Sequence, residues 1–372
     1  MKNGISHGYL PINSNGLKTD TMIGCDLYLL VKIGNDSRYV LYSKGDTVFE
    51  KNKREKLIEK NISRLFIKKE DRKKFYEYLE TNFQSIISDA RISPDERTKI
   101  VYDAATNLAK DLFNDPRIGS IERVKTFAYN MVDCVLKDSR IAHSLIKIAI
   151  HEYYTYTHSV NVSAIGTLFV ENLGFGVKDL RGFCSGILLH DIGKTKISAD
   201  ILKKKGKLTE EEFDVIKRHP ELGVEVLKET GSDLKDEYII TLQHHESVDG
   251  SGYPYGLKNN EIHRCGKIAS IIDTYDGLTT NRPYGEAVRP FAALLEMKEK
   301  MLNRFDTEMF KEFILPHLKR AVTAVHEEGA KCIKHCDGNI WPLLDMMVEA
   351  DIDCINPLEP VANMDIADVK DK

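Results

Sequence analysis

Residues 187–194 read ILLHDIGK, so an adjacent His-Asp pair directly follows an apolar run. Three more histidines come soon after it along the chain: His219 precedes a proline, and His244 and His245 are neighbours. A proline at the second position fits the first turn of a helix that begins at His219. Residues 140–312 are predicted to be mostly helical, with one long glycine-containing loop around 247–261.

Metal-binding residue types are concentrated in and around this region. Divalent transition metals at hydrolytic sites are held by neutral imidazoles and carboxylates. The candidates of these types are His158, His190, Asp191, His219, His244, His245 and Asp273. Seven donors are too many for one ordinary zinc ion, so two metal ions are expected. Each residue alone is a weak indication, because a single histidine is more often an ordinary core or surface residue.

The motifs around these residues resemble the HD-GYP subgroup of the HD phosphohydrolase superfamily. They are, in chain order, HDIGK (190–194), HPELG (219–223), HHE (244–246), DGSGYP (249–254), DTYDGLT (273–279) and RPY (282–284). The resemblance covers residues 140–314. It implies an all-helical, metal-dependent phosphodiesterase domain that hydrolyses cyclic di-GMP, a bacterial second messenger, to linear pGpG. Whether hydrolysis continues to GMP is left open.

The resemblance also implies roles for individual residues. The seven candidates match the family's metal ligands, with Asp191 bridging ions that are commonly iron or manganese. Tyr154 stands where three-metal members carry Glu, so a two-metal centre is expected. Lys194 matches a lysine near the scissile phosphate and is assigned to catalysis together with Asp191. Arg282 matches a substrate contact, and Tyr253 is expected either to contact the nucleotide or to pack its own loop.

One departure from the family pattern affects the choice of substrate. Gly285 stands where the family usually has Lys or Arg, which removes one expected contact to a phosphate or base. Two other functions therefore stay open. One is a non-catalytic receptor or scaffold for the cyclic dinucleotide, and the other is a hydrolase that prefers cyclic GMP-AMP.

The N-terminal part carries no catalytic constellation. Residues 1–68 are predicted to form a small α+β sensory or regulatory domain, with strands at 26–33, 38–43, 47–49 and 62–67 and a helix at 52–60. Residues 69–139 are predicted to be a helical connector. The stretch 51–74 holds eleven Lys or Arg and four acidic residues. We interpret it as a solvated face, because aromatic residues do not alternate with its cations as in a nucleic-acid platform.

The C-terminal part resembles a different family. HCDGN (335–339) and NPLEP (356–360) are similar to motifs of the uroporphyrinogen decarboxylase and corrinoid methyltransferase superfamily, whose fold is a TIM barrel. Residues 315–372 are too few to close such a barrel, which needs about 250 residues. They are predicted to be a βα fragment with the order helix 316–329, strand 330–335, helix 340–350 and strand 352–356. A metal site at His335 and Asp337 is disfavoured. The fold class expected for the whole chain is α+β.

Composition excludes several classes of protein. The chain has 372 residues, a net charge of -4 and a pI of about 6.3, which argue against a partner that is a nucleic-acid polymer. No apolar run approaches the roughly 18 residues of a membrane-spanning helix, so no membrane insertion is expected. Seven scattered cysteines without a CxxC pair suggest reduced thiols and a cytoplasmic location. Cyclic di-GMP is the expected partner, and a homodimer is left open.

Overall fold

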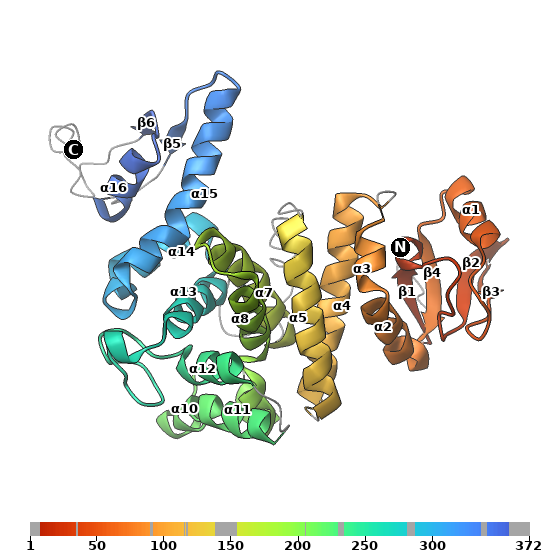
Figure 1. Cartoon of the computed structure of the whole chain (residues 1–372), viewed down its shortest axis with the longest axis horizontal. Coiled ribbons are helices and arrows are strands. Elements are labelled where there is room, and N and C mark those ends of the chain that lie inside the picture. Colours follow the sequence, from red (N-terminus) through yellow and green to blue (C-terminus); the bar gives the residue numbers. More distant parts are fainter. Residues whose placement is uncertain are drawn as a thin grey trace. The chain divides into compact units, whose positions relative to one another are not determined.

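The computed structural model describes residues 8–34, 36–89, 92–114, 116, 118–137, 155–204, 206–229, 234–280, 287–335 and 341–356. The chain divides into two compact units, Met1–Ile148 and Ala149–Lys372. Helices dominate the described residues, with a four-stranded sheet in the first unit and a two-stranded sheet in the second (Figure 1). The predicted α+β fold class is confirmed.

The first unit is built on an antiparallel sheet with the strand order β1-β4-β2-β3. Its elements are β1 (Tyr9–Asn13), η1 (Ser14–Gly16), β2 (Leu27–Ile33), β3 (Asp36–Ser43), α1 (Lys51–Glu59), β4 (Arg64–Lys68), η2 (Lys69–Asp71), α2 (Arg72–Thr81), α3 (Phe83–Ile87), α4 (Pro94–Asn114) and α5 (Ile118–Lys137). Strands β2, β3 and β4 and helix α1 lie within about two residues of their predicted positions.

One strand prediction in this unit was wrong, and one strand was not predicted. The strand expected at 47–49 is absent, and only an isolated bridge joins Met22 to Val48. A turn in which the Thr47 amide donates to the Lys44 carbonyl takes up this segment instead. Strand β1 was not predicted, and it contains Pro11. A proline is tolerated there because β1 is an edge strand, where one side of the backbone needs no partner.

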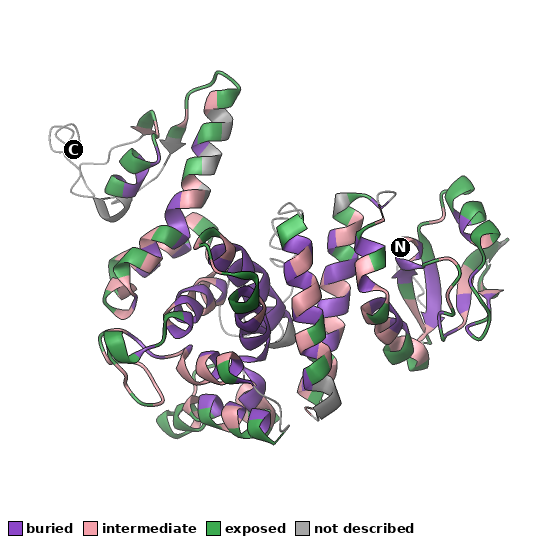
Figure 2. Ribbon diagram, in the orientation of Figure 1, coloured by how far each residue is buried: buried purple, intermediate pink, exposed green. Residues whose placement is uncertain are grey.

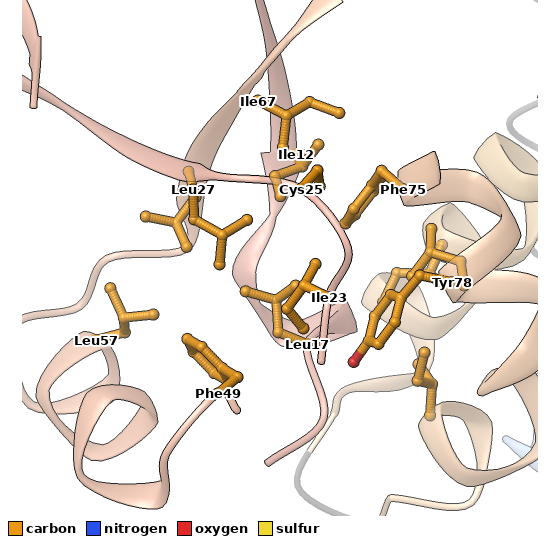
Figure 3. Packing of buried hydrophobic residues seen from close by; sticks show 14 of the residues in the cluster. Ile12, Leu17, Ile23, Cys25, Leu27, Phe49, Leu57, Ile67, Phe75 and Tyr78 are labelled. Carbon is orange, nitrogen blue, oxygen red and sulfur yellow. The ribbon is translucent and has the colours of Figure 1, made fainter. Parts of the chain in front are cut away.

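The core of the first unit lies between the sheet and its helices. Leu17, Leu27 and Phe49 are fully buried and belong to the same cluster as Phe75 and Tyr78 from α2 (Figure 3). Burying large apolar side chains of this kind is the main driving force for the fold. Helix α2 therefore shares its core with the sheet, although it belongs to the segment predicted as a connector. The limits of the domains stay a prediction.

The second unit is mainly helical. Its elements are α7 (Thr155–Asn172), α8 (Val177–Leu189), η3 (Ile192–Lys196), α9 (Ala199–Leu202), α10 (Glu210–Lys217), α11 (His219–Lys228), α12 (Lys235–Gln243), η4 (Asn259–Glu261), α13 (Arg264–Thr279), α14 (Pro290–Met301), η5 (Leu302–Arg304), α15 (Thr307–Glu327), β5 (Ile333–His335), α16 (Trp341–Glu349) and β6 (Cys354–Asn356). Most of helix α7 is buried, whereas α8 is exposed at its first three residues and buried from Gly182 to its end (Figure 2). They pack on each other, α12 packs on α8, and α13 packs on both α7 and α12.

The C-terminal segment shows the predicted alternation of strands and helices. Strands β5 and β6 pair in parallel and are separated by α16. The helix expected from residue 316 begins at Thr307, where the Asp306 carboxylate caps it by accepting from the Met309 amide at 3.2 Å. Pro316 lies inside this helix instead of in its first turn. Residues 336–340 and 357–372, which carry Asp337 and most of the second motif, are outside the described part of the chain.

No helix among the described residues is both long and apolar enough to cross a membrane.

Candidate metal centre

All seven candidate ligands lie in the second unit, on or directly beside five packed helices. His158 is on α7, His190 and Asp191 follow α8, His219 begins α11, His244 and His245 follow α12, and Asp273 is on α13. The apolar run of α8 is buried up to Leu189, so its end delivers the His-Asp pair into the interior. Segments more than a hundred residues apart in sequence thus meet at one place.

Asp191 lies at the centre of this arrangement. Its Oδ1 atom is 3.3 Å from His219 Nε2 and 3.9 Å from His244 Nε2. Its Oδ2 atom is 3.6 Å from His190 Nε2 and 3.9 Å from His158 Nε2. The two carboxylate oxygens therefore face different pairs of imidazoles. This is the arrangement expected of a carboxylate that bridges two ions.

The donor atoms fall into two groups, each within 4.8 Å. The first group is Asp191, His219, His244 and His245, and the second is His158, His190 and Asp273. In the second group, His158 Nε2 lies 2.9 Å from Asp273 Oδ1. His245 Nδ1 lies 3.6 Å from Asp273 Oδ2, which connects the two groups.

Three of the imidazoles are oriented by backbone carbonyls three residues earlier. Each Nδ1 donates to such a carbonyl at 2.6–2.9 Å, and the acceptors are Ile187 for His190, Ile216 for His219 and Thr241 for His244. These carbonyls belong to the last turns of α8, α10 and α12, where helical hydrogen-bond partners run out. The hydrogen bond fixes the tautomer, so each Nε2 presents its lone pair to the centre.

Two buried polar atoms at the centre have no hydrogen-bond partner among the described residues. They are His190 Nε2 and Asp191 Oδ1. Leaving such atoms unsatisfied in the interior costs about 1–3 kcal/mol each. A divalent cation would satisfy both, and a set of imidazole nitrogens and carboxylate oxygens suits a transition metal. The side chains present therefore fit metal ions.

The protonation states favour this use of the histidines. Burial lowers the pKa of His219 to about 3 and that of His245 to about 4. Burial also lowers the pKa of His190, and it holds that of His244 well below the ordinary value. These four imidazoles are therefore neutral at pH 7, which is the form that binds a metal.

The carboxylates are ionised for a different reason. Burial alone would raise the pKa of Asp191, but the Lys194 ammonium and nearby imidazoles hold it well below the usual range. Burial likewise opposes ionisation of Asp273, yet its hydrogen bond with His158 keeps its pKa low. Burial would lower the pKa of His158, but its hydrogen bonds to Asp273 and Asp276 raise it well above the usual value. His158 and Asp273 could hold an ion together, and its positive charge would replace that of the proton on His158.

Asp276 supports the site, and sequence analysis assigned it no role. Its Oδ2 accepts a hydrogen bond from His158 Nδ1 at 2.6 Å, and its Oδ1 accepts one from Thr280 at 3.2 Å. Asp276 is 2% exposed and lies one helical turn after Asp273. A carboxylate behind a ligand histidine fixes the ring and makes it a better donor. The signal for it was the Asp-x-x-Asp spacing, which places both carboxylates on one face of α13.

Replacing Asp276 with asparagine is expected to weaken metal binding about 10- to 100-fold, because His158 loses its charged orienting partner. Metal titration of the apo protein measures this change. The matched control is Thr280→Val, which removes the weaker hydrogen bond to the same carboxylate and should cost much less. Equal metal affinity for Asp276→Asn and the unmodified protein would contradict the role.

The loop after His245 is held by a second buried acid without an assigned role. Glu246 is 1% exposed, and its carboxylate accepts from the amides of Tyr255 at 2.8 Å and Leu257 at 2.9 Å. The Tyr253 amide donates to the His245 carbonyl at 3.1 Å, and the Tyr253 ring lies 4.6 Å from the His245 ring. The GYP loop is therefore folded back over the metal centre, with Tyr253 packed on a candidate ligand.

Three residues discussed for the HD-GYP resemblance lie outside the described part of the chain. They are Tyr154, Arg282 and Gly285. Lys194 is described, and its ammonium lies 2.5 Å from Asp191 Oδ2. The proposed substrate contact at Arg282 stays a prediction.

Residues 148–309 match the family described as the HD domain. This match covers the part of the chain that holds all seven candidate ligands. Residues 288–370 match the family described as uroporphyrinogen decarboxylase (URO-D), which confirms the second resemblance. That match begins before residue 315 and overlaps the end of the HD domain, so the boundary predicted there stays a prediction.

Several curated bacterial proteins are similar to the HD domain and its surroundings. The cyclic di-GMP phosphodiesterase PA4108 of Pseudomonas aeruginosa is 32% identical over 61% of this chain and 56% of its own length. The cyclic di-GMP phosphodiesterase response regulator RpfG of Xanthomonas campestris is 39% identical over 39% of each chain. The 3'3'-cGAMP-specific phosphodiesterase 3 of Vibrio cholerae is 33% identical over 47% of this chain and 37% of its own. The chain thus spans about half or less of these relatives.

A solved structure shares the fold. The protein Bd1817 of Bdellovibrio bacteriovorus, described as an HDG"Y"P protein, aligns with a TM-score of 0.58 over 82% of this chain and 98% of its own. Its sequence identity is 21%, so the likeness concerns the fold alone. The fold described above therefore has a counterpart among solved structures.

Proposed function

We propose that the HD domain is a metal-dependent phosphodiesterase that hydrolyses cyclic di-GMP to pGpG in bacterial signalling. The observation that carries the proposal is the convergence of six side chains with nitrogen or oxygen donor atoms around the buried carboxylate of Asp191, which is the seventh candidate. The names of the curated relatives support the substrate class. The extent of hydrolysis beyond pGpG is a question for the product assay.

Two divalent ions, iron or manganese, are the proposed cofactors. The two donor groups and the two-sided position of Asp191 support that number. The donors are imidazoles and carboxylates without thiolates, which suits these metals. Bound ions would lower the pKa of a water molecule to generate the nucleophile and would neutralise charge on the phosphoryl oxygens.

The residues around the donors define how the substrate approaches. The side chains of Lys194 and of the candidate ligands His245 and Asp273 are 18%, 23% and 13% exposed, whereas those of the other five candidate ligands are at most 2% exposed. The phosphodiester therefore reaches the centre from the side of these three residues. Lys194 can hold a phosphoryl oxygen or stabilise the departing 3′-oxygen, because its ammonium is a compact cation at that entrance.

The test is incubation of protein loaded with manganese or iron with cyclic di-GMP under reducing conditions, followed by separation of products. We expect pGpG to appear in proportion to the bound metal. Absence of turnover with both ions bound would contradict the phosphodiesterase proposal. Binding of cyclic di-GMP without turnover would instead support a receptor or scaffold.

Replacing Lys194 with alanine is expected to lower kcat roughly 100-fold or more, because one positive charge at the developing oxyanion is lost. The metal content should stay nearly unchanged, since the lysine is not a donor to the ions. Metal analysis and steady-state kinetics on the same preparation separate the two effects. Full turnover in Lys194→Ala would place the scissile phosphate elsewhere.

A second substrate is favoured by one specific comparison. A relative of similar identity is named as specific for 3'3'-cGAMP, so a hydrolase preferring this mixed dinucleotide is the alternative. Competition between the two dinucleotides in the same assay distinguishes them.

Residues 1–68 are proposed to act as a regulatory domain, and residues 315–372 are proposed to be a barrel fragment, which the C-terminal family match supports.

A further inference from the structure

The rings of His245, Tyr253 and Phe213 lie next to one another in that order and form an aromatic row at the exposed side of the metal centre. The Tyr253 ring lies 4.6 Å from the His245 ring, and the Phe213 ring lies 6.5 Å from Tyr253 at an interplanar angle of 78°. His245 is the most exposed of the candidate ligands for which a side-chain exposure is known. The row therefore starts at the side from which a phosphodiester would approach and ends at Phe213.

Phe213 is exposed on a helix that is firmly held. Its residue exposure is 44%, so part of the ring surface is accessible to a ligand. Helix α10 begins with a capping box between Thr209 and Glu212, and Lys204 binds the same glutamate at 2.6 Å. The end of α10 is tied to the metal centre, because the Ile216 carbonyl accepts from His219 Nδ1. The ring is thus presented at a defined position relative to the ligands.

A cation accompanies this ring. Lys217 Nζ lies 4.8 Å from the Phe213 ring centroid and 2.8 Å from an Asp214 carboxylate oxygen. The lysine side chain is 38% exposed, so it can exchange this surface ion pair for another partner at little cost. An ammonium donates well to the O6 and N7 acceptors of guanine, and adenine has an amino group where guanine has O6.

We propose that Phe213 and Lys217 form a guanine-binding subsite beside the metal centre. A base of the cyclic dinucleotide stacks on Phe213 while a phosphodiester lies at the ions, and Lys217 donates to the guanine edge. Within one nucleotide, the ribose separates the base from the phosphate. The ring of Tyr253 likewise separates Phe213 from the candidate ligand His245, so a base on Phe213 and a phosphate at the ions can belong to the same nucleotide. This inference rests on the proposed function, because it names the part of the same substrate that α10 recognises.

The experiment measures equilibrium binding to the full-length, metal-loaded protein. The probes are a bisphosphorothioate analogue of cyclic di-GMP that resists hydrolysis and inorganic phosphate, which has no base. Replacing Phe213 with alanine should raise the Kd of the analogue roughly tenfold, which is typical of losing one base-aromatic stack. The Kd of phosphate and the metal content should not change. Phe213→Trp should restore binding, because it keeps a stacking surface.

Two further variants sharpen the test. Val215→Ala alters another exposed apolar side chain of α10 and should leave both Kd values unchanged. Lys217→Gln should reduce the preference for the cyclic di-GMP analogue over the matching cyclic di-AMP analogue. An unchanged Kd in Phe213→Ala, or an equal loss for phosphate, overturns the subsite. A protein that shows the predicted binding changes but no turnover contradicts the phosphodiesterase proposal alone.

Discussion

Replacing Asp191 with asparagine is expected to abolish both metal binding and hydrolysis of cyclic di-GMP. Each oxygen of this carboxylate faces a different pair of imidazoles, so an amide removes one oxygen donor and the negative charge on which both ions depend. Activity should fall to that of the metal-free protein. Metal analysis and the product assay on one preparation measure the two losses together.

The matched control for Asp191→Asn is Asp214→Asn, which makes the same chemical change at a surface side chain that is 69% exposed. It should keep full metal content and turnover. The thermal unfolding midpoint of each variant shows whether the fold is retained. Retention of both ions and full turnover in Asp191→Asn would show that the metal centre lies elsewhere.

Replacing Gly193 with alanine is expected to have the largest effect on stability. A Cβ atom at this position would collide with the backbone carbonyl of His219 and the backbone of Gly223, and neither can move aside as a flexible side chain could. The residue lies in η3, where it packs closely on α11. Forcing these elements apart should cost about 3 kcal/mol in the free energy of unfolding.

The same displacement would separate Asp191 from His219, so metal content should fall with stability. Denaturant unfolding and metal analysis measure the two effects. The control is Gly176→Ala, because the closest atom to a Cβ there is 3.9 Å away and the site is only the start of α8. Equal unfolding free energies for the two alanine variants would show that the contact between η3 and α11 tolerates a side chain.

Sequence patterns predicted much of the fold because the signals involved are local. The apolar run before His190 predicts a buried helix, and the proline after His219 predicts a helix start. Strand alternation predicted β2, β3 and β4 to within about two residues. Strand β1 was missed because its formation depends on pairing with β4, more than fifty residues later, and not on its own sequence.

The candidate site shows the same division. Residue type and motif spacing named seven candidate donors, and the tertiary structure places the other six around Asp191. The supporting acid Asp276 was not recognised, because its role depends on contact with His158 from another helix. Phe213 likewise reads as an ordinary apolar residue of an amphipathic helix until its position beside Tyr253 is known.

The sequence by itself determined the helical segments, the chemical types of the donors and the resemblance to an HD domain. These properties depend on the side chains themselves and on neighbours within a few residues. Only the tertiary structure decided which oxygen of Asp191 faces which imidazole, which carboxylate supports His158, and which side of the centre is open. Those features arise from packing between segments far apart in the chain, and no local pattern encodes the distance between them.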